Sequence, residues 1–216
     1  ADGPPPASYS PDRWPTPPAA PFGMPAARYA VLHVGASTPL KLWAPDRGRA
    51  IARRVEALGL EPVWSGGRGE DALVRDCDPA GAHRSYAGRL DLPQMRTLLD
   101  RAALLVSPDT GVAHLARIAG TPSVTLYGPG SATITGAGRF YAAMPWRGVT
   151  VDPFPCRDQT ILFRRDIPWV RRCGRSTAEC AHLRCMDASG VDAVAAAIDD
   201  VLALPDPRAN PGERTS

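Results

Sequence analysis

One stretch of the sequence combines residue types that suit the binding of an anionic group. In SPDTGVAHLA (107–116), an apolar run ends, Asp109 sits in a turn, and a helical pattern begins at Thr110 or Gly111. Free N–H groups at a helix N-terminus attract anions, and glycine lets a diphosphate approach the backbone closely. His114 follows one turn into the predicted helix. We interpret this stretch as a candidate diphosphate site; the alternative is an ordinary helix cap with a packed histidine.

Lys41 is the second residue that could carry such chemistry. It is the one lysine in a chain whose lysines and arginines together number 25. It follows a predicted strand in the loop ASTPLKLW, which also supplies Ser37. A compact ammonium suits a phosphate oxygen in a tight loop better than a planar guanidinium does. We therefore expect Lys41 to be the counter-ion of a diphosphate; the alternative is that one surface lysine is there by chance.

A third candidate, Glu70, follows a glycine turn in WSGGRGED. Its carboxylate could accept hydrogen bonds from a ribose diol. The alternative is that Glu70 compensates the dipole of the helix that begins beside it.

The surrounding pattern predicts the elements that position these residues. Apolar runs predict strands at 28–34, 61–67, 103–109 and 123–129, and periodic segments predict helices at 44–59, 69–76, 92–102, 110–120 and 191–204. Strands that alternate with helices favour an α/β, Rossmann-like fold with a parallel sheet and helices on both faces. In such folds ligands bind at the carboxyl ends of the strands, where all three candidates lie.

The composition of the chain indicates how it is divided into a domain and tails, and which kinds of partner it does not suit. We expect a nucleotide-sugar-binding domain at 28–205, a proline-rich tail or linker at 1–27 and a flexible tail at 206–216. Trp14 and Phe22 are candidate docking residues in the first tail, with a disordered leader as the alternative. A net charge of +3 does not indicate a nucleic-acid partner, and no apolar run approaches a membrane span. With no apparent signal peptide, we expect a cytoplasmic location.

Four of the five cysteines lie close together in the sequence. The spacing C-x16-C-x6-C-x4-C suits a tetrahedral zinc or iron site formed by Cys156, Cys173, Cys180 and Cys185. Arginine neighbours should lower the thiol pKa values and balance an anionic centre. Such a closed site would be structural; free thiols or disulfides are the alternatives. Cys77 stands apart, and we expect it to be buried.

The motifs together resemble glycosyltransferase family 9, the ADP-heptose heptosyltransferases and their relatives. The resemblance rests on K-x-W-x-P, GGxGED, D-T-G-x-x-H-x-A and PSVTLYGP in that order, and runs from about 28 to 203. Members have two facing Rossmann-like domains, the GT-B arrangement, and this chain resembles the C-terminal, donor-binding half. The cysteine-rich stretch resembles that of protein heptosyltransferases that modify autotransporters, in which a four-cysteine site binds iron.

The resemblance implies roles for individual residues. Ser37 and Lys41 would face the diphosphate of an ADP-sugar, Glu70 would bind the ribose, and Leu90 would lie beside the adenine. The diphosphate and the transferred sugar would be held by Asp109, Thr110, Gly111 and His114. No metal is needed at this donor site. The catalytic base would come from an N-terminal acceptor domain or a partner chain, so the catalytic residue is unknown here.

These observations leave two functions open. The first is the donor half of a glycosyltransferase that moves a heptose-like sugar to lipopolysaccharide core or a protein hydroxyl. The second is a non-catalytic nucleotide-sugar-binding or assembly module. An epimerase on the same architecture would need an acid pair near the sugar, and the sequence offers no convincing one.

Overall fold

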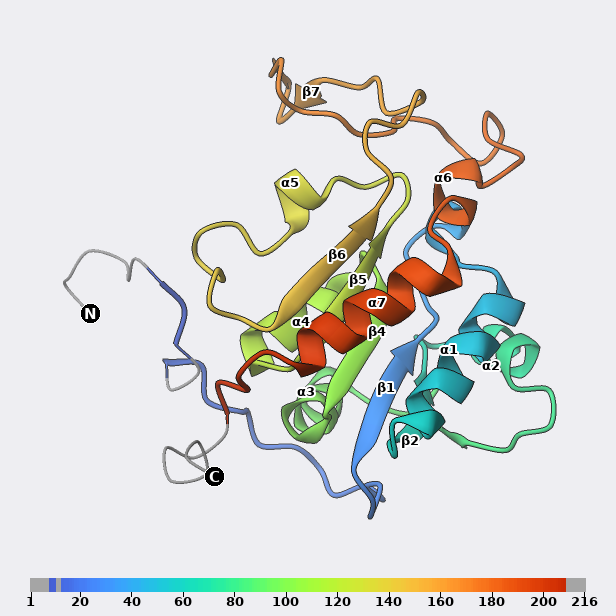
Figure 1. Ribbon diagram of the computed structural model, residues 1–216, viewed down its shortest axis with the longest axis vertical. Helices are drawn as coiled ribbons and strands as arrows, with labels where there is room; N and C mark the ends of the chain where they lie inside the picture. Colours follow the sequence, from blue (N-terminus) through green and yellow to red (C-terminus); the bar gives the residue numbers. More distant parts are fainter. Residues whose placement is uncertain (1–7, 11–12, 209–216) are drawn as a thin grey trace.

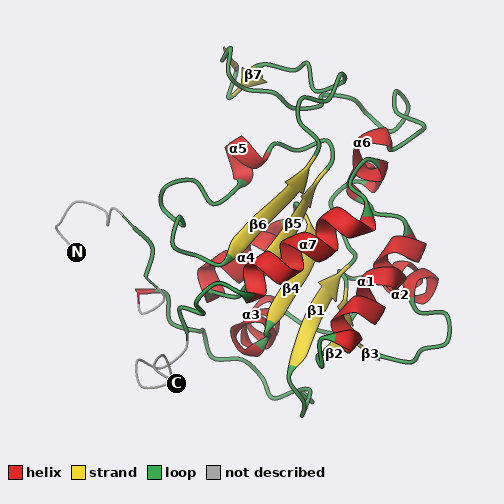
Figure 2. Ribbon diagram, viewed as in Figure 1, coloured by secondary structure: helices red, strands yellow, loops and turns green. Residues whose placement is uncertain are grey.

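The computed structural model describes residues 8–10 and 13–208, and its centre is a six-stranded parallel sheet (Figures 1 and 2). Its strands follow the order β3-β2-β1-β4-β5-β6. They are β1 (Tyr29–His33), β2 (Glu61–Ser65), β3 (Arg84–Ser85), β4 (Leu104–Pro108), β5 (Ser123–Tyr127) and β6 (Trp146–Thr150). The chain builds outward from β1 in one direction and from β4 in the other. This strand order creates a switch point between β1 and β4, where open α/β sheets bind ligands.

Helices cover both faces of the sheet, as the sequence predicts (Figure 1). One face carries α1 (Pro45–Ala57), α2 (Asp71–Cys77) and α7 (Val191–Leu202), and the other carries α3 (Leu92–Arg101) and α4 (Gly111–Ala119). Three short helices lie in connections: η2 (Pro39–Lys41), α5 (Ala132–Thr135) and α6 (Arg184–Asp187). The predicted α/β, Rossmann-like class is confirmed.

Strand β1 shows how sequence pattern divides the core into two layers. Ala30 and Leu32 pack with the α1 and α7 side, whereas Tyr29 and Val31 pack with the α3 and α4 side. Because successive side chains of a strand point to opposite faces, a fully apolar strand needs helices on both sides. The end of β1 is thereby fixed in the middle of the molecule.

Besides the two-residue edge strand β3, two strand regions were not predicted from sequence. One is the edge strand β6, whose polar residues and Gly148 hide the pattern; a Cβ at Gly148 would lie 2.9 Å from the Trp146 ring. The other is a hairpin of β7 (Ile161–Leu162) and β8 (Arg165–Asp166) in the long segment between β6 and α6. This segment rises above the carboxyl ends of β5 and β6 (Figure 1).

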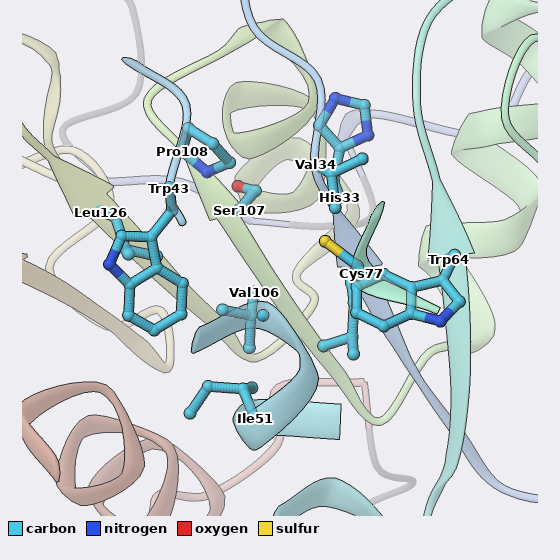
Figure 3. Close-up of a pocket in the computed structure, with 12 residues that line it drawn as sticks. His33, Val34, Trp43, Ile51, Trp64, Cys77, Val106, Ser107, Pro108 and Leu126 are labelled. Carbon is cyan, nitrogen blue, oxygen red and sulfur yellow. The ribbon is translucent and has the colours of Figure 1, made fainter. Parts of the chain in front are cut away.

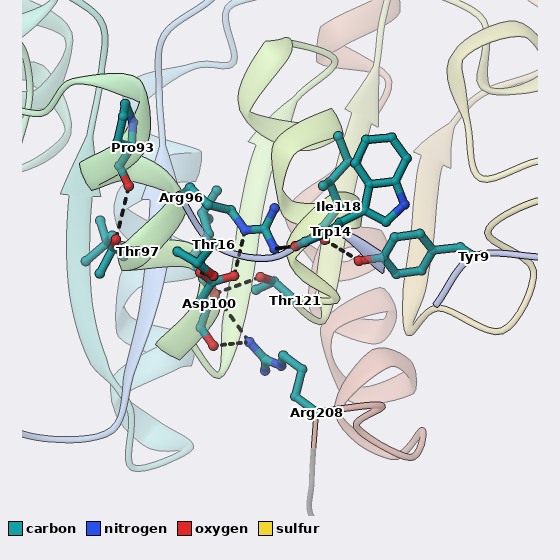
Figure 4. A network of polar contacts seen from close by, with 12 residues as sticks. Tyr9, Trp14, Thr16, Pro93, Arg96, Thr97, Asp100, Ile118, Thr121 and Arg208 are labelled. Carbon is teal, nitrogen blue, oxygen red and sulfur yellow. Dashed lines mark hydrogen bonds and ion pairs between the residues drawn. The ribbon is translucent and has the colours of Figure 1, made fainter. Parts of the chain in front are cut away.

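Residues 1–7 and 11–12 of the predicted proline-rich tail lie outside the described residues. The described part, residues 8–10 and 13–27, contacts the helices α3 and α4 (Figure 4). Arg96 Nη2 donates to the Trp14 carbonyl at 2.9 Å, and Thr16 bonds to Asp100. Phe22 packs edge-on against Tyr86 with ring centroids 5.8 Å apart, while the Trp14 ring stays 44% exposed. Of the two candidate docking residues, Phe22 docks by its ring and Trp14 by its backbone.

The expected C-terminal tail at 206–216 lies largely outside the described residues. Within the described part, Arg208 Nη2 donates to the Ala102 carbonyl at 2.9 Å, which ties the chain to the end of α3. Among the residues placed in the structure, no helix has the length and apolar character needed to cross a bilayer.

Candidate functional site

The site is built where β1 and β4 end side by side. The two strands pair in parallel, so the loop that follows His33 and the loop that follows Pro108 leave the same edge of the sheet. The first loop leads through Ser37 to η2, and the second leads through Asp109 to α4. Two segments far apart in sequence therefore meet at the switch point of the sheet.

The N-terminus of α4 presents donors that the protein itself does not use. Thr110 is the N-cap residue, but its side chain makes no capping bond, and its hydroxyl oxygen is buried without a hydrogen-bond partner among the described residues. A buried polar atom without a partner costs free energy, so this hydroxyl suits a ligand oxygen. A Cβ built at Gly111 meets nothing within 4 Å. Local packing therefore does not require glycine there, whereas the close approach of a ligand would.

Lys41 stands across from this helix end and is held in place by Asp109. Its Nζ lies 3.0 Å from Asp109 Oδ2 and 2.7 Å from the Asp109 carbonyl oxygen. Asp109, 6% exposed, also accepts a bond from the Thr135 hydroxyl at 3.2 Å. An ammonium has three N–H groups, and these contacts use two of them. The third remains for a ligand.

His114 completes the group on the first turn of α4. Its Nδ1 lies 2.6 Å from Arg117 Nη2, and its Nε2 lies 4.0 Å from Asp109 Oδ1. Burial lowers the pKa of His114, Arg117 and Lys41 lower it further, and Asp109 opposes them. The imidazole therefore stays neutral near neutral pH, and about half of its side chain (48%) is exposed.

Glu70 joins the loops that follow β1 and β2. Its carboxylate accepts bonds from the backbone N–H groups of Ala36, at 3.2 Å, and Gly67. A Cβ at Gly35 would lie 1.8 Å from Glu70 Oε2, so the close approach requires glycine at that position. Helix α2 begins beside Glu70 without a side-chain cap, so the residue serves the two loops rather than a helix cap.

The predicted donor-site residues line an open cleft. A space of about 590 Å³ is bounded by Ser37, Glu70, Thr110, Gly111 and His114, and a connected space of about 240 Å³ adds Lys41, Asp109 and Thr135. The structure thus brings together seven of the eight predicted residues. The eighth, Leu90, packs against the α3 and α4 core layer, and Leu92 lines the cleft instead.

Two further residues of the cleft region were missed from sequence. His33 ends β1, lines the cleft, and shares a 2.9 Å hydrogen bond between its Nδ1 and Ser65 Oγ. Burial lowers the pKa of His33 to about 4. Its position directly before the Gly35 loop was a usable signal. Arg117 gave no sequence signal, because it looks like any arginine near a helix C-terminus.

A separate apolar cavity adjoins the ends of β1 and β4 and shares His33 with the cleft; Figure 3 shows the residues that line this cavity. It has a volume of about 40 Å³ and is bounded by Trp43, Ile51, Trp64, Cys77 and Leu126, among others. Cys77 is buried there, as predicted. Such a volume holds little more than a water molecule or a methyl group. A nucleotide-sized ligand fits the open cleft and not this cavity.

The cysteine-rich segment, residues 155–188, does not show the predicted four-sulfur arrangement. All five cysteines are free thiols. Cys156, Cys180 and Cys185 line one pocket, and Cys173 lines the neighbouring one. Among the described residues, no three metal-ligating side chains are close enough together to hold an ion.

The expectation that arginines lower the thiol pKa values is wrong for Cys185. Burial raises the pKa of Cys185, the nearby Cys156 adds to the rise, and Arg157 only partly opposes it. The arginines instead bind backbone oxygens. Arg157, 4% exposed, donates to the carbonyls of Gly128, Tyr127 and Val151 at 2.8–3.0 Å.

Comparison with known proteins agrees with this geometry. The family model of glycosyltransferase family 9 (heptosyltransferase) matches residues 11–150. Lipopolysaccharide heptosyltransferase 3 of Escherichia coli is 27% identical over 106 residues, which are 46% of this chain and 31% of that protein.

Two solved structures share the fold. The structure of E. coli ADP-heptose lipopolysaccharide heptosyltransferase II aligns with a TM-score of 0.59 and 18% identity, over 82% of this chain and 46% of that one. The dodecameric iron-containing heptosyltransferase TibC of enterotoxigenic E. coli, in complex with ADP-D-beta-D-heptose, aligns with a TM-score of 0.58 and 17% identity, over 84% and 47%.

The chain thus spans less than half the length of each of these relatives. The family model, however, matches well over half of the chain, and its range includes the strand ends and the α4 N-terminus that build the cleft. The chain belongs to glycosyltransferase family 9, the heptosyltransferase family.

Proposed function

We propose that this chain binds an ADP-activated, heptose-like sugar and supplies the donor-binding half of a glycosyltransferase. The acceptor would be a hydroxyl of lipopolysaccharide core or of a protein. One observation carries the proposal. The α4 N-terminus, with the unpartnered Thr110 hydroxyl and the open space at Gly111, faces an ammonium that has one N–H to spare. Such a pocket matches a diphosphate in both charge and hydrogen-bond donors.

We assign a part of the donor to each group of the cleft. Lys41, Thr110 and the first N–H groups of α4 would hold the diphosphate, with Ser37 and the Nε2–H of His114 beside it. Glu70, in the larger space, would bind the ribose. Leu90 was predicted beside the adenine, and the exposed Leu92 now joins it as a candidate. Asp109 would hold Lys41 and contact the sugar.

The proposed reaction is a direct displacement at the anomeric carbon. The acceptor oxygen forms a bond to that carbon, the bond from the carbon to the phosphate oxygen breaks, and ADP leaves with the electron pair. The acceptor proton passes to a base from an N-terminal acceptor domain or a partner chain. Lys41 and the α4 N–H groups would stabilise the charge that develops on ADP. We propose the cytoplasm as the compartment, since five free thiols suit a reducing environment.

Calorimetric titration with ADP tests the donor site directly. Lys41→Ala should weaken ADP binding about 10- to 100-fold, because a hydrogen bond to a charged group contributes about 1.5–3 kcal/mol. Arg54→Ala is the control, because Arg54 pairs with Asp199 on the α1 and α7 side and should not change ADP affinity. Wild-type protein that shows no heat with ADP at millimolar concentration would refute the proposal.

A non-catalytic nucleotide-sugar-binding or assembly module is the second candidate. It is favoured by the cleft, whose residues account for donor binding alone, whereas the proposed reaction takes its base from an acceptor domain or a partner chain. Turnover separates the two, because binding of ADP without transfer of sugar by the chain alone, or with an added acceptor domain, would support the module.

We also propose, from the cysteine spacing and from the likeness to the iron-containing heptosyltransferase TibC, that the cysteine-rich segment takes up iron or zinc. As they lie, the four sulfurs do not fit a tetrahedral site, so no step of the reaction is assigned to a metal. Elemental analysis of natively purified protein tests this. About one metal ion per chain, lost in Cys185→Ser, is expected; protein free of iron and zinc with full stability would contradict it.

A further inference from the structure

Arg117 is buried in the second turn of α4 without a carboxylate partner. It is 2% exposed, and two of its nitrogens, Nε and Nη1, are buried with no hydrogen-bond partner in the part of the chain that the structure describes. Within the described part of the chain, no acidic group lies within ion-pair distance of its guanidinium. A buried charge with so few partners is costly, so its position calls for a reason.

Aromatic rings hold the guanidinium in place. Its central carbon lies 5.9 Å from the centroid of the Tyr141 ring and 5.7 Å from that of the Trp146 ring, both within cation–π range. Trp146 is anchored by a 3.0 Å bond from its Nε1 to Thr125 Oγ1. Tyr9 packs on Tyr141 at 5.1 Å between ring centroids. Figure 4 shows Tyr9 reaching the Ile118 carbonyl on the next residue of α4.

The polar contact of Arg117 is with His114. Arg117 Nη2 lies 2.6 Å from His114 Nδ1. A guanidinium has no acceptor, so Arg117 donates and Nδ1 must be unprotonated. In a neutral imidazole the proton is then on Nε2. The charged groups that act on His114 are Arg117 on the same helix, Lys41 from η2 and Asp109 from the end of β4.

We propose that Arg117 is a positioning residue that fixes His114 as the neutral tautomer with its Nε2–H presented to the cleft. Nε2 would donate to an oxygen of the ADP diphosphate, a role that rests on the proposed function. The positive charges of Arg117 and Lys41 disfavour a protonated imidazole, and the lowered pKa of His114 agrees with this. Because His114 is then a fixed donor, its imidazole would need no change of tautomer to bind the diphosphate.

Nitrogen NMR spectra of the free protein test the tautomer without any ligand. Long-range proton–nitrogen correlations of ¹⁵N-labelled protein near neutral pH distinguish protonation at Nδ1 from protonation at Nε2; His114→Gln identifies the signals of residue 114. We expect a single Nε2–H form. Protonation at Nδ1, or an averaged pattern typical of free histidine, would overturn the proposal.

Substitutions at Arg117 separate positioning from packing. Arg117→Met keeps an unbranched apolar chain against the rings but removes the donor, so His114 should become a mixture of tautomers with a higher pKa. Arg117→Lys should largely keep the wild-type pattern. Tyr141→Leu is the packing control, because it removes one ring and leaves the bond to His114. If Arg117→Met does not fold, the spectra of the wild type and of Arg117→Lys still show whether His114 is held as the single Nε2–H tautomer.

ADP titration separates this proposal from the proposed function. Arg117→Met should weaken ADP binding about 10-fold, as expected for one misplaced donor to a charged group, with Arg117→Lys closer to wild type. If wild-type protein shows the Nε2–H form but does not bind ADP, the proposed function fails and the positioning role stands. If Arg117→Met loses the single tautomer but binds ADP as tightly as wild type, His114 does not contact the diphosphate.

Discussion

The cleft at the switch point and the cysteine-rich segment lie at the same end of the sheet but are built in opposite ways. At the cleft, regular parallel strands fix the backbone without help from polar side chains. Among the described residues, the Thr110 hydroxyl, the first N–H groups of α4 and one N–H of Lys41 therefore remain without protein partners. In the cysteine-rich segment there is little regular structure, and arginines such as Arg157 and Arg175 bind backbone carbonyls.

The difference separates polar groups used for folding from polar groups left for a ligand. The guanidinium of Arg157 donates from each of its three nitrogens to a backbone carbonyl, so it serves the fold, however basic its surroundings look in the sequence. A hydroxyl at a helix N-cap that makes no cap bond is not used. Unused donors beside a pocket are therefore a better indication of a binding site than the number of charges in a segment.

The largest effect is expected where Arg157 ties the cysteine-rich segment to β5. Arg157→Met leaves three carbonyls without their donor, and should lower the free energy of unfolding by about 4 kcal/mol. Arg172→Met is the matched control, since the half-buried Arg172 side chain makes an exposed 3.2 Å bond to the Ile161 carbonyl. Denaturant unfolding with tryptophan fluorescence measures both. Equal, small losses would show that arginines do not hold this segment together.

The next effect concerns the pH dependence of stability through His33. Burial lowers its pKa from the usual 6.5 to about 4, so the unfolded chain binds a proton more readily than the folded one between these values. The free energy of unfolding therefore keeps the full contribution of neutral His33 above pH 6.5. It falls as the pH drops towards 4, by up to about 3 kcal/mol.

Urea unfolding of wild type and His33→Gln at several pH values isolates this contribution. The wild type should lose stability more steeply with acid than the variant, which lacks the titrating ring. Parallel curves for the two proteins would mean that His33 is not held neutral by burial.

Substitutions at two glycines should give the smallest changes in stability. They compare a glycine that the fold requires with a glycine that ligand binding requires. Gly35→Ala places a Cβ against the Glu70 carboxylate and should cost about 2 kcal/mol, in the range of overpacked sites. Gly111→Ala meets open space and should leave stability within about 0.5 kcal/mol while it weakens ADP binding. Thermal melts and calorimetry read the two quantities separately. A destabilised Gly111→Ala that binds ADP normally would reverse the assignment.

Sequence reasoning predicted the helices and strands that have a regular hydrophobic pattern and a clear residue, such as glycine, at their ends. The buried strands β1, β4 and β5 appear as apolar runs, and Gly120 marks the end of α4 with a left-handed φ of 73°. The residues of the cleft could be predicted because parallel strands bring their carboxyl ends to one edge.

The remaining features depend on contacts that no local pattern encodes. The side chains of the edge strand β6 are mostly half-buried, so they show no apolar run, and the place of Trp146 follows from its contact with Arg117. The pair of Lys41 with Asp109 joins residues 68 positions apart. The cysteine spacing suggested a metal site. Spacing along the chain, however, does not determine the positions of the four sulfur atoms, which depend on the loops and on the contacts of the arginines.

A structure of the protein with ADP bound tests the central claim most directly. The account predicts the diphosphate at the N-terminus of α4, within hydrogen-bond distance of the Gly111 N–H and the Thr110 hydroxyl, with Lys41 Nζ turned towards it. An empty cleft at saturating ADP, or ADP bound elsewhere with Lys41 still directed only at Asp109, would contradict it.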